Sequence, residues 1–304
     1  MRKNTKYKGV VIPAVTPLTE DFKLDKAALE KMFFNFHQNN VLPFIIGTTG
    51  EAASLSINLK QEYVKEAVKL KTKGTVLYAG IASNCFEESV DLAKYCFDNG
   101  VDVVAANLPS YYALSINDIR KYFERLVEKI QGPLIIYNIP STTHMSIPLD
   151  VIDDLSFHPD IVGVKDSERS DERLKESLKL WSNRKDFSHF IGWAARSAEA
   201  LQNGSDGLIP STGNLYPKLY DDMYRALEKE NAEKAFQLQK LSDQLGDLYQ
   251  KGRLLGESLW ALKVLMQEAG ICKSTVMPPL QPLADENCLK KELHRLVKEQ
   301  GIQL

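Results

Sequence analysis

The 304-residue sequence is poor in cysteine, and its cysteines and histidines form no metal-binding or redox pattern. Its four cysteines include no Cys-x-x-Cys pair, and no two of its five histidines stand at zinc-ligand spacing. The sequence therefore predicts neither a disulfide framework nor a metal site. This usage favours a reducing compartment, so we expect the protein in the cytoplasm.

Long apolar runs and an excess of either charge are also lacking. No segment approaches the roughly 18 apolar residues of a membrane span, and residues 1–8 do not contain the apolar stretch of a signal peptide. The 38 Lys and Arg residues nearly balance 40 Asp and Glu residues. We therefore expect no membrane span and no nucleic-acid partner.

The sequence instead contains eight short apolar runs separated by amphipathic segments. Each run is continuously apolar rather than alternating, which is typical of strands covered on both faces in a parallel sheet. The runs span residues 9–15, 42–46, 76–80, 101–106, 134–138, 161–165, 187–191 and 207–209. Strand and amphipathic segment together repeat at roughly 30 residues, the length of a strand with its crossover helix.

Eight such units predict an α/β fold, a (β/α)8 or TIM barrel over residues 1–230. The alternative is an open, doubly wound sheet. That fold usually has a Gly-rich phosphate turn after its first strand, and Pro13-Ala14-Val15-Thr16-Pro17 is no such turn. Residues 231–304 carry further apolar stripes and are interpreted as a C-terminal helical extension, whose stripes serve core packing or contact between copies.

Two helix starts are predicted from reciprocal caps, in which a polar side chain is followed three residues later by Glu or Gln. The first pairs Asn58 with Gln61, and the second pairs Asn84 with Glu87.

Lys165 is the most informative residue for function, because it ends the sixth apolar run. In a barrel enzyme the strands' carboxyl ends line the active site. Barrel walls would desolvate the amine and lower its pKa, and a neutral amine can form a Schiff base with a ketone. The alternative is a lysine that extends to solvent from the strand end or pairs with Asp166.

Hydroxyl groups end two of the predicted strands. Tyr137 ends the fifth run, so its phenol is expected near Lys165, where it could transfer protons; otherwise it is a buried core tyrosine. Residues 47–51, Gly-Thr-Thr-Gly-Glu, follow the second run. Glycines let a loop present successive N–H groups, a geometry that binds a carboxylate, although a simple turn would also explain them.

Four motifs at these strand ends together resemble one family. Gly-Thr-Thr-Gly-Glu at 47–51, Pro109-x-Tyr111, Tyr-Asn-Ile-Pro at 137–140 and Gly-Val-Lys-Asp at 163–166 occur in order. The sequence thus resembles the dihydrodipicolinate synthase / N-acetylneuraminate lyase family of class I, pyruvate-dependent aldolases. The likeness runs from about residue 9 to the C-terminus.

The resemblance implies a role for each matching residue, without a cofactor. Lys165 matches the Schiff-base lysine and Tyr137 the proton-relaying tyrosine. Thr48 and Thr49 match the carboxylate site, and Thr48 also links Tyr137 to a second tyrosine. That tyrosine, Tyr111, reaches a neighbouring subunit's site in the family, so a homo-oligomer, usually a dimer of dimers, is implied. The backbone of Ile209 would face the pyruvyl group.

Departures from the family pattern bear on the substrate. Thr142 stands where dihydrodipicolinate synthases carry an arginine, and Gly192 is followed by Trp193 where sialic acid lyases carry an acidic pair. A 2-keto-3-deoxy sugar acid or hydroxy-oxoglutarate is therefore expected, with a synthase, a dehydratase or a non-catalytic keto-acid-binding regulator as alternatives. Further polar groups would hold it: Thr142, His144, Ser167, Arg196 and Ser211.

Overall fold

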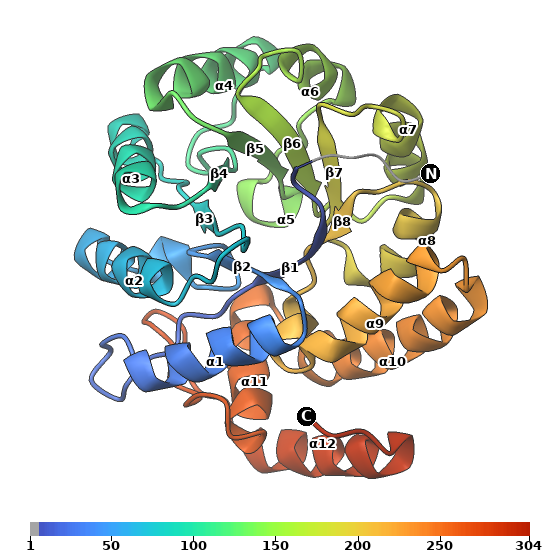
Figure 1. The fold of residues 1–304 in the computed structure, drawn as a ribbon. Coiled ribbons are helices and arrows are strands. Elements are labelled where there is room, and N and C mark those ends of the chain that lie inside the picture. Colours follow the sequence, from blue (N-terminus) through green and yellow to red (C-terminus); the bar gives the residue numbers. More distant parts are fainter. Residues whose placement is uncertain (1–5) are drawn as a thin grey trace.

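Eight parallel strands close into a barrel in a computed structural model that describes residues 6–304 (Figure 1). The strand order follows the sequence, and β1 pairs with β8 to close the ring. This confirms the predicted (β/α)8 fold and rules out an open doubly wound sheet. The strands are β1 (Gly9–Pro13), β2 (Leu42–Ile45), β3 (Tyr78–Gly80), β4 (Val103–Ala106), β5 (Leu134–Asn138), β6 (Ile161–Asp166), β7 (Ser188–Ile191) and β8 (Gly207–Leu208).

Helices connect the strands and surround the barrel (Figure 1). The connecting helices are α1 (Lys26–Gln38), α2 (Ile57–Lys69), α3 (Phe86–Asn99), α4 (Ile116–Ile130), α5 (Pro140–Thr143), α6 (Leu149–Leu155), α7 (Asp171–Trp181) and α8 (Ser197–Gln202), with α9 (Pro217–Glu228) after β8. Short 3₁₀ turns follow β2, β7 and β8: η1 (Ala52–Ser54), η2 (Ala194–Arg196) and η3 (Ser211–Asn214).

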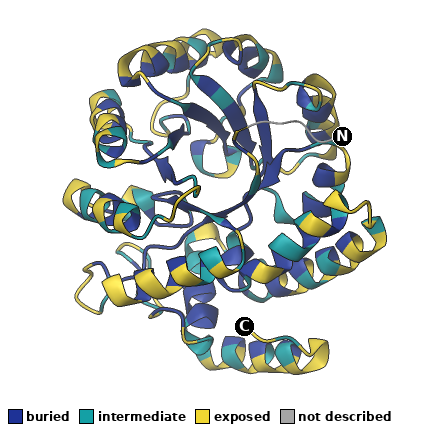
Figure 2. Cartoon of the chain, viewed as in Figure 1, coloured by how far each residue is buried: buried dark blue, intermediate teal, exposed yellow. Residues whose placement is uncertain are grey.

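Each connecting helix buries one side against the strands, as the alternation of buried and exposed residues in Figure 2 shows. α4 illustrates why. Its buried residues Ile119, Phe123 and Ile130 recur at helical spacing, and its first turn is held by a reciprocal cap between Ser115 and Asp118. Local capping and apolar periodicity therefore favour the same helix.

The two predicted helix caps are wrong in position. α2 begins before the predicted cap, because the Ser56 hydroxyl accepts the N–H of Leu59 and so caps the helix two residues earlier. α3 begins after Cys85, and the carboxamide of Asn84 is used elsewhere: its Oδ1 accepts the N–H groups of Ser110 at 2.8 Å and Tyr111 at 3.3 Å. The side chain thus supports a neighbouring loop instead of its own helix.

The inside of the barrel is filled by a compact apolar cluster. Its buried members are Tyr7, Val11, Phe44, Tyr78, Val103, Ala105, Ile135, Phe190 and Ile209. Three of these rings, Phe44, Tyr78 and Phe190, pack at centroid distances of 6.1–6.5 Å. The interior is therefore a packed core, and a ligand can enter only at the ends of the strands.

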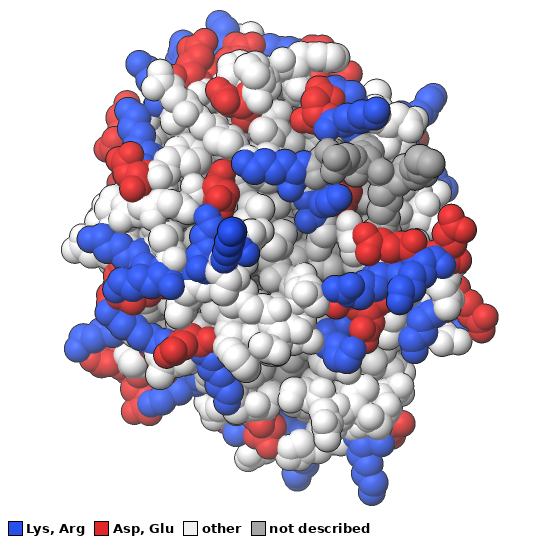
Figure 3. Space-filling view, viewed as in Figure 1, with Lys and Arg blue, Asp and Glu red and all other residues white. Residues whose placement is uncertain are grey.

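Three helices follow the barrel: α10 (Ala232–Gln250), α11 (Leu255–Glu268) and α12 (Glu286–Gln300). α10 packs along α9 and α8, while α11 packs against α10 and α12 (Figure 1). Within residues 6–304, none of the helices is both long and apolar enough to cross a membrane. On the face shown in Figure 3, acidic and basic side chains are interspersed around an uncharged central area.

Candidate active site

Lys165 and Tyr137 lie side by side at the carboxyl ends of β6 and β5. The two residues are register partners in the parallel pair, as their order at consecutive strand ends predicts. The Lys165 Nζ atom lies 3.9 Å from the centroid of the Tyr137 ring and 4.9 Å from that of Phe44. Both residues are buried. An amine and a phenol therefore share one buried environment beside the Phe44 ring, here called the recess of Lys165.

The environment of Lys165 differs from that of an ordinary surface lysine. The residue is only 3% exposed, so it does not extend to solvent. Burial lowers its pKa, and the nearby Tyr137 phenol partly opposes this shift. Asp166 is engaged elsewhere: its Oδ2 accepts from the Arg173 Nε at 2.6 Å, and its Oδ1 accepts from the Asn138 Nδ2 at 3.0 Å. Both alternatives weighed from the sequence are thereby ruled out.

The partners of Asp166 form a network that sequence reasoning missed. Arg173 of α7 also donates to the carbonyl of Ile147 at 2.9 Å, while the N–H of Ile147 donates to the Asn138 Oδ1 at 3.0 Å. Glu168 accepts from Asn138 at 3.0 Å. The network ties β5, β6, α7 and the loop before α6 together, so it holds the strand end that carries Lys165 in place.

Residues 47–51 form a tight turn after β2. The N–H groups of Gly50 and Glu51 donate within the turn, each at 3.0 Å. Those of Thr48 and Thr49 donate to no acceptor among residues 6–304, so the turn can offer them to a carboxylate. Ile46 enters the turn with φ of 55°. Because left-handed backbone is unfavourable for a β-branched residue, the turn is held in a strained conformation, as functional loops often are.

Tyr111 lies apart from this recess in the single chain. It is 78% exposed, and its ring makes a T-shaped contact with Tyr112 at 4.9 Å between centroids. Its backbone is fixed by the Asn84 carboxamide described above. Hydrogen bonds therefore hold the backbone of this loop, whereas the side chains of Tyr111 and Tyr112 are exposed to solvent.

The remaining predicted residues lie on the loops after β5 to β8. Ile209 is buried, and its N–H donates to the Ile191 carbonyl at 2.9 Å. Ser167 lies against Gly192, where an added Cβ would come within 2.0 Å of the Ser167 Oγ. A larger residue at position 192 would therefore have to displace the Ser167 hydroxyl, and the loops after β6 and β7 meet there. Ser211 hydrogen-bonds to the Tyr249 hydroxyl at 2.7 Å.

The last predicted substrate-binding residues are Arg196, after β7, and Thr142 and His144 in the segment after β5. Arg196 donates to both carboxylate oxygens of Asp171, at 2.6 and 3.0 Å, and its guanidinium lies 4.6 Å from the centroid of the Trp193 ring. Thr142 is half-buried and donates to the Ile139 carbonyl at 3.3 Å, whereas His144 is exposed. Of the predicted residues, Arg196 is thus the one already paired with a carboxylate.

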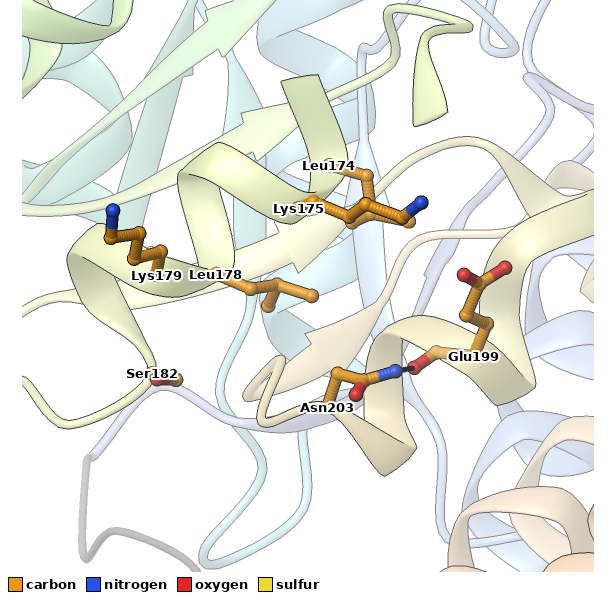
Figure 4. Close-up of a pocket in the computed structure, with 7 residues that line it drawn as sticks. All are labelled: Leu174, Lys175, Leu178, Lys179, Ser182, Glu199 and Asn203. Atoms are coloured by element: carbon orange, nitrogen blue, oxygen red, sulfur yellow. Dashed lines mark hydrogen bonds between the residues drawn. The ribbon is translucent and has the colours of Figure 1, made fainter. Parts of the chain in front are cut away.

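A separate groove lies between α7 and α8 on the outside of the barrel (Figure 4). It is lined by Leu174, Lys175, Leu178, Lys179, Ser182, Glu199 and Asn203. These side chains come from the helices rather than from the strand ends, so the groove is distinct from the recess of Lys165.

Comparison with known proteins identifies the family of this chain. The sequence model of the dihydrodipicolinate synthetase family matches residues 6–300. The chain belongs to this family. Members of the dihydrodipicolinate synthetase family are lyases, and the protein is therefore an enzyme of this class.

Individual family members resemble the chain over nearly its whole length. An uncharacterised DapA-like lyase of Pyrococcus abyssi is 30% identical over 89% of this chain and 91% of its own. The 4-hydroxy-tetrahydrodipicolinate synthase of Bartonella bacilliformis is 28% identical, covering 91% of this chain and 93% of its own. The solved chloride-inhibited dihydrodipicolinate synthase of Acinetobacter baumannii, complexed with pyruvate, is 26% identical with a TM-score of 0.86, covering 97% and 99% of the two chains.

Proposed function

We propose that the protein is a Schiff-base-forming lyase that makes or cleaves a carbon–carbon bond to pyruvate. The observation that carries this proposal is the buried amine of Lys165, which faces the Tyr137 ring and has no carboxylate partner in Asp166. The pyruvate complex of the Acinetobacter baumannii relative supports the same class of substrate.

The chemistry follows from the neutral form of the Lys165 amine, which burial favours by lowering its pKa. Lys165 attacks the ketone carbon of a 2-keto acid, and the resulting carbinolamine loses water after protonation of its hydroxyl through Tyr137. The Tyr137 phenolate then takes the proton of the C4 hydroxyl, and the protonated imine accepts the electron pair of the bond between C3 and C4, which releases an aldehyde and leaves an enamine. Protonation at C3 and hydrolysis release pyruvate and the free lysine. The N–H groups and hydroxyls of Thr48 and Thr49 hold the carboxylate.

The site is completed, in this proposal, by a second copy of the chain. The exposed Tyr111 side chain would reach the neighbouring subunit's recess, where Thr48 links it to Tyr137, within a homo-oligomer built as a dimer of dimers. Its 78% exposure in the single chain leaves the ring available for such a contact. All four cysteines are free, which suits the cytoplasm as the site of action.

The substrate we propose is a 2-keto-3-deoxy sugar acid or hydroxy-oxoglutarate. Thr142 offers one hydroxyl where a synthase arginine would make two charge-assisted bonds to a carboxylate. Ser167, His144 and Ser211 would hold the hydroxyls or distal carboxylate of the longer keto acid. Arg196 already donates two hydrogen bonds to Asp171 and pairs with Glu199 at 3.3 Å, so a substrate carboxylate would compete with these two acids for its guanidinium.

Borohydride reduction in the presence of pyruvate tests the proposed function. We expect a reduced pyruvyl adduct on the peptide that contains Lys165, measured by mass spectrometry. Because burial lowers the lysine's pKa, trapping should persist below the pH range of an ordinary lysine, whose pKa is about 10.4. An adduct confined to another lysine, or none with any of several 2-keto acids, would contradict the proposal.

A substrate panel tests the acceptor side. Pyruvate release from 2-keto-3-deoxy acids, hydroxy-oxoglutarate and N-acetylneuraminate is compared with condensation of pyruvate and aspartate semialdehyde. Loss of a desolvated charge-assisted contact costs about 2–5 kcal/mol. We therefore expect the semialdehyde reaction to fall roughly 30-fold or more below that of a synthase. If aspartate semialdehyde gives the highest kcat/KM of the panel, the substrate assignment is wrong while the Schiff-base proposal stands.

A further inference from the structure

Glu51 and Lys263 form an ion pair in the interior, between the turn after β2 and α11. Their side chains are 0% and 1% exposed, and the Lys263 Nζ contacts the Glu51 Oε1. Both groups also have a backbone partner. Glu51 Oε2 accepts the N–H of Met277 at 2.6 Å, and Lys263 donates to the carbonyl of Thr275 at 2.7 Å.

A buried ion pair contributes little to the free energy of folding. Desolvation of two charges offsets much of their attraction, and apolar residues of similar volume often stabilise a protein as well or better. A buried ion pair that is also hydrogen-bonded instead fixes the positions of the segments that carry it. The hydrogen bonds of the carboxylate and the ammonium are directional, so their partners can occupy only a few positions.

The geometry in question is that of the carboxylate-binding turn. Glu51 is its last residue, has φ of 58°, and donates its N–H to the carbonyl of Thr48 at 3.0 Å. The Thr16 hydroxyl also donates to the carbonyl of Gly50 at 2.6 Å. The turn is therefore held between the segment after β1 and the C-terminal extension, residues 231–304.

We propose that Glu51 and Lys263 are positioning residues through which the C-terminal extension sets the conformation of Thr48 and Thr49 for binding the keto-acid carboxylate. The inference rests on the proposed function, because it assigns that carboxylate to the turn. It gives the extension a part in substrate binding.

The test removes the charges of Glu51 and Lys263 and keeps the volumes of both side chains nearly unchanged. In the double variant Glu51→Gln/Lys263→Met, the glutamine can still accept from Met277. Lys290→Met is the matched control: Lys290 is in α12 of the same extension, pairs with Glu286 at 2.8 Å and is partly exposed. The pyruvate concentration that half-saturates borohydride trapping at Lys165 is measured beside the thermal unfolding midpoint and maximal trapping.

We expect half-saturation in the double variant to require about tenfold more pyruvate, since a misplacement of about 1 Å can cost about 100-fold. Maximal trapping should be retained, and Lys290→Met should match the wild type. Glu51→Gln alone leaves the Lys263 ammonium buried without a carboxylate, so it should shift half-saturation in the same direction and lower the unfolding midpoint more than the double variant does.

A folded double variant with wild-type half-saturation would overturn the inference. Failure of both the single and the double Glu51→Gln variants to fold would also overturn it, because the pair would then be a stability element. If the wild type forms no adduct, the proposed function fails and this inference fails with it. If the wild type forms the adduct and the folded variants bind pyruvate equally well, only the inference fails.

Discussion

Lys165→Ala is expected to abolish turnover while leaving the fold intact. Without the amine no imine forms, so the carbon–carbon bond has no electron sink, and pyruvate release should fall below detection. Lys175→Ala is the matched control, because this lysine lies on the exposed face of the adjacent helix α7 and should keep wild-type activity. A Lys165→Ala enzyme that still releases pyruvate at a substantial fraction of the wild-type rate would exclude Schiff-base catalysis at this residue.

A Lys165→Met variant is expected to change how the stability of the protein depends on pH, in a direction that the lysine's burial determines. Burial depresses the lysine's pKa in the folded state, so the unfolded chain binds more protons below its ordinary value of about 10.4. Wild-type stability should therefore rise with pH through this window, while the methionine variant lacks that contribution. We expect the variant's advantage in unfolding midpoint to be largest at low pH and to disappear as pH approaches 10.4.

Tyr137→Phe is expected to lower kcat by about 10²–10⁴-fold, the usual contribution of a positioned acid–base group. Phenylalanine keeps the ring against which the Lys165 Nζ packs at 3.9 Å, so the lysine should remain buried and the fold unchanged. Thr48→Val and Tyr111→Phe should give smaller losses in kcat, because in the proposed proton relay both residues act through Tyr137.

Single-turnover trapping with borohydride measures imine formation separately from the later steps of turnover. In Tyr137→Phe, imine formation should be slow but should still reach completion on Lys165. Tyr112→Phe is the control, because this ring is exposed beside Tyr111 and has no assigned role. A Tyr137→Phe enzyme with the wild-type rate would remove the phenol from the mechanism.

The strands, and the pairing of Tyr137 with Lys165, could be predicted from the sequence. The strands follow from local apolar runs, and the pairing follows because strands that are consecutive in the chain are adjacent in the barrel. Consecutive βα units place consecutive strands side by side, so residues near the carboxyl ends of β5 and β6 had to meet. Tyr137 and Lys165 are register partners for this reason. Local apolar runs also located all eight strands to within two residues at each end.

Contacts that depend on how distant segments pack could not be predicted in the same way. Arg173 lies inside α7, where one arginine among several charged residues gives no sign that it holds Asp166. Asn84 had the spacing of a helix cap, yet tertiary packing assigned its carboxamide to the Tyr111 loop. Arg196 pairs with Asp171 for a similar reason, since the loop after β7 approaches the start of α7 only in the folded barrel.

The distance along the chain between the turn after β2 and its distant partners has a consequence for biosynthesis. Glu51 and Met277, which donates to its carboxylate, are separated by 226 residues. At a synthesis rate of about 5–20 residues per second, the carboxylate emerges about 10–45 s before the last of its partners. During translation Glu51 therefore stays without its two partners until α11 and the segment up to Met277 have left the ribosome. A nascent chain stalled before that helix should expose this turn to protease, whereas the released protein should protect it.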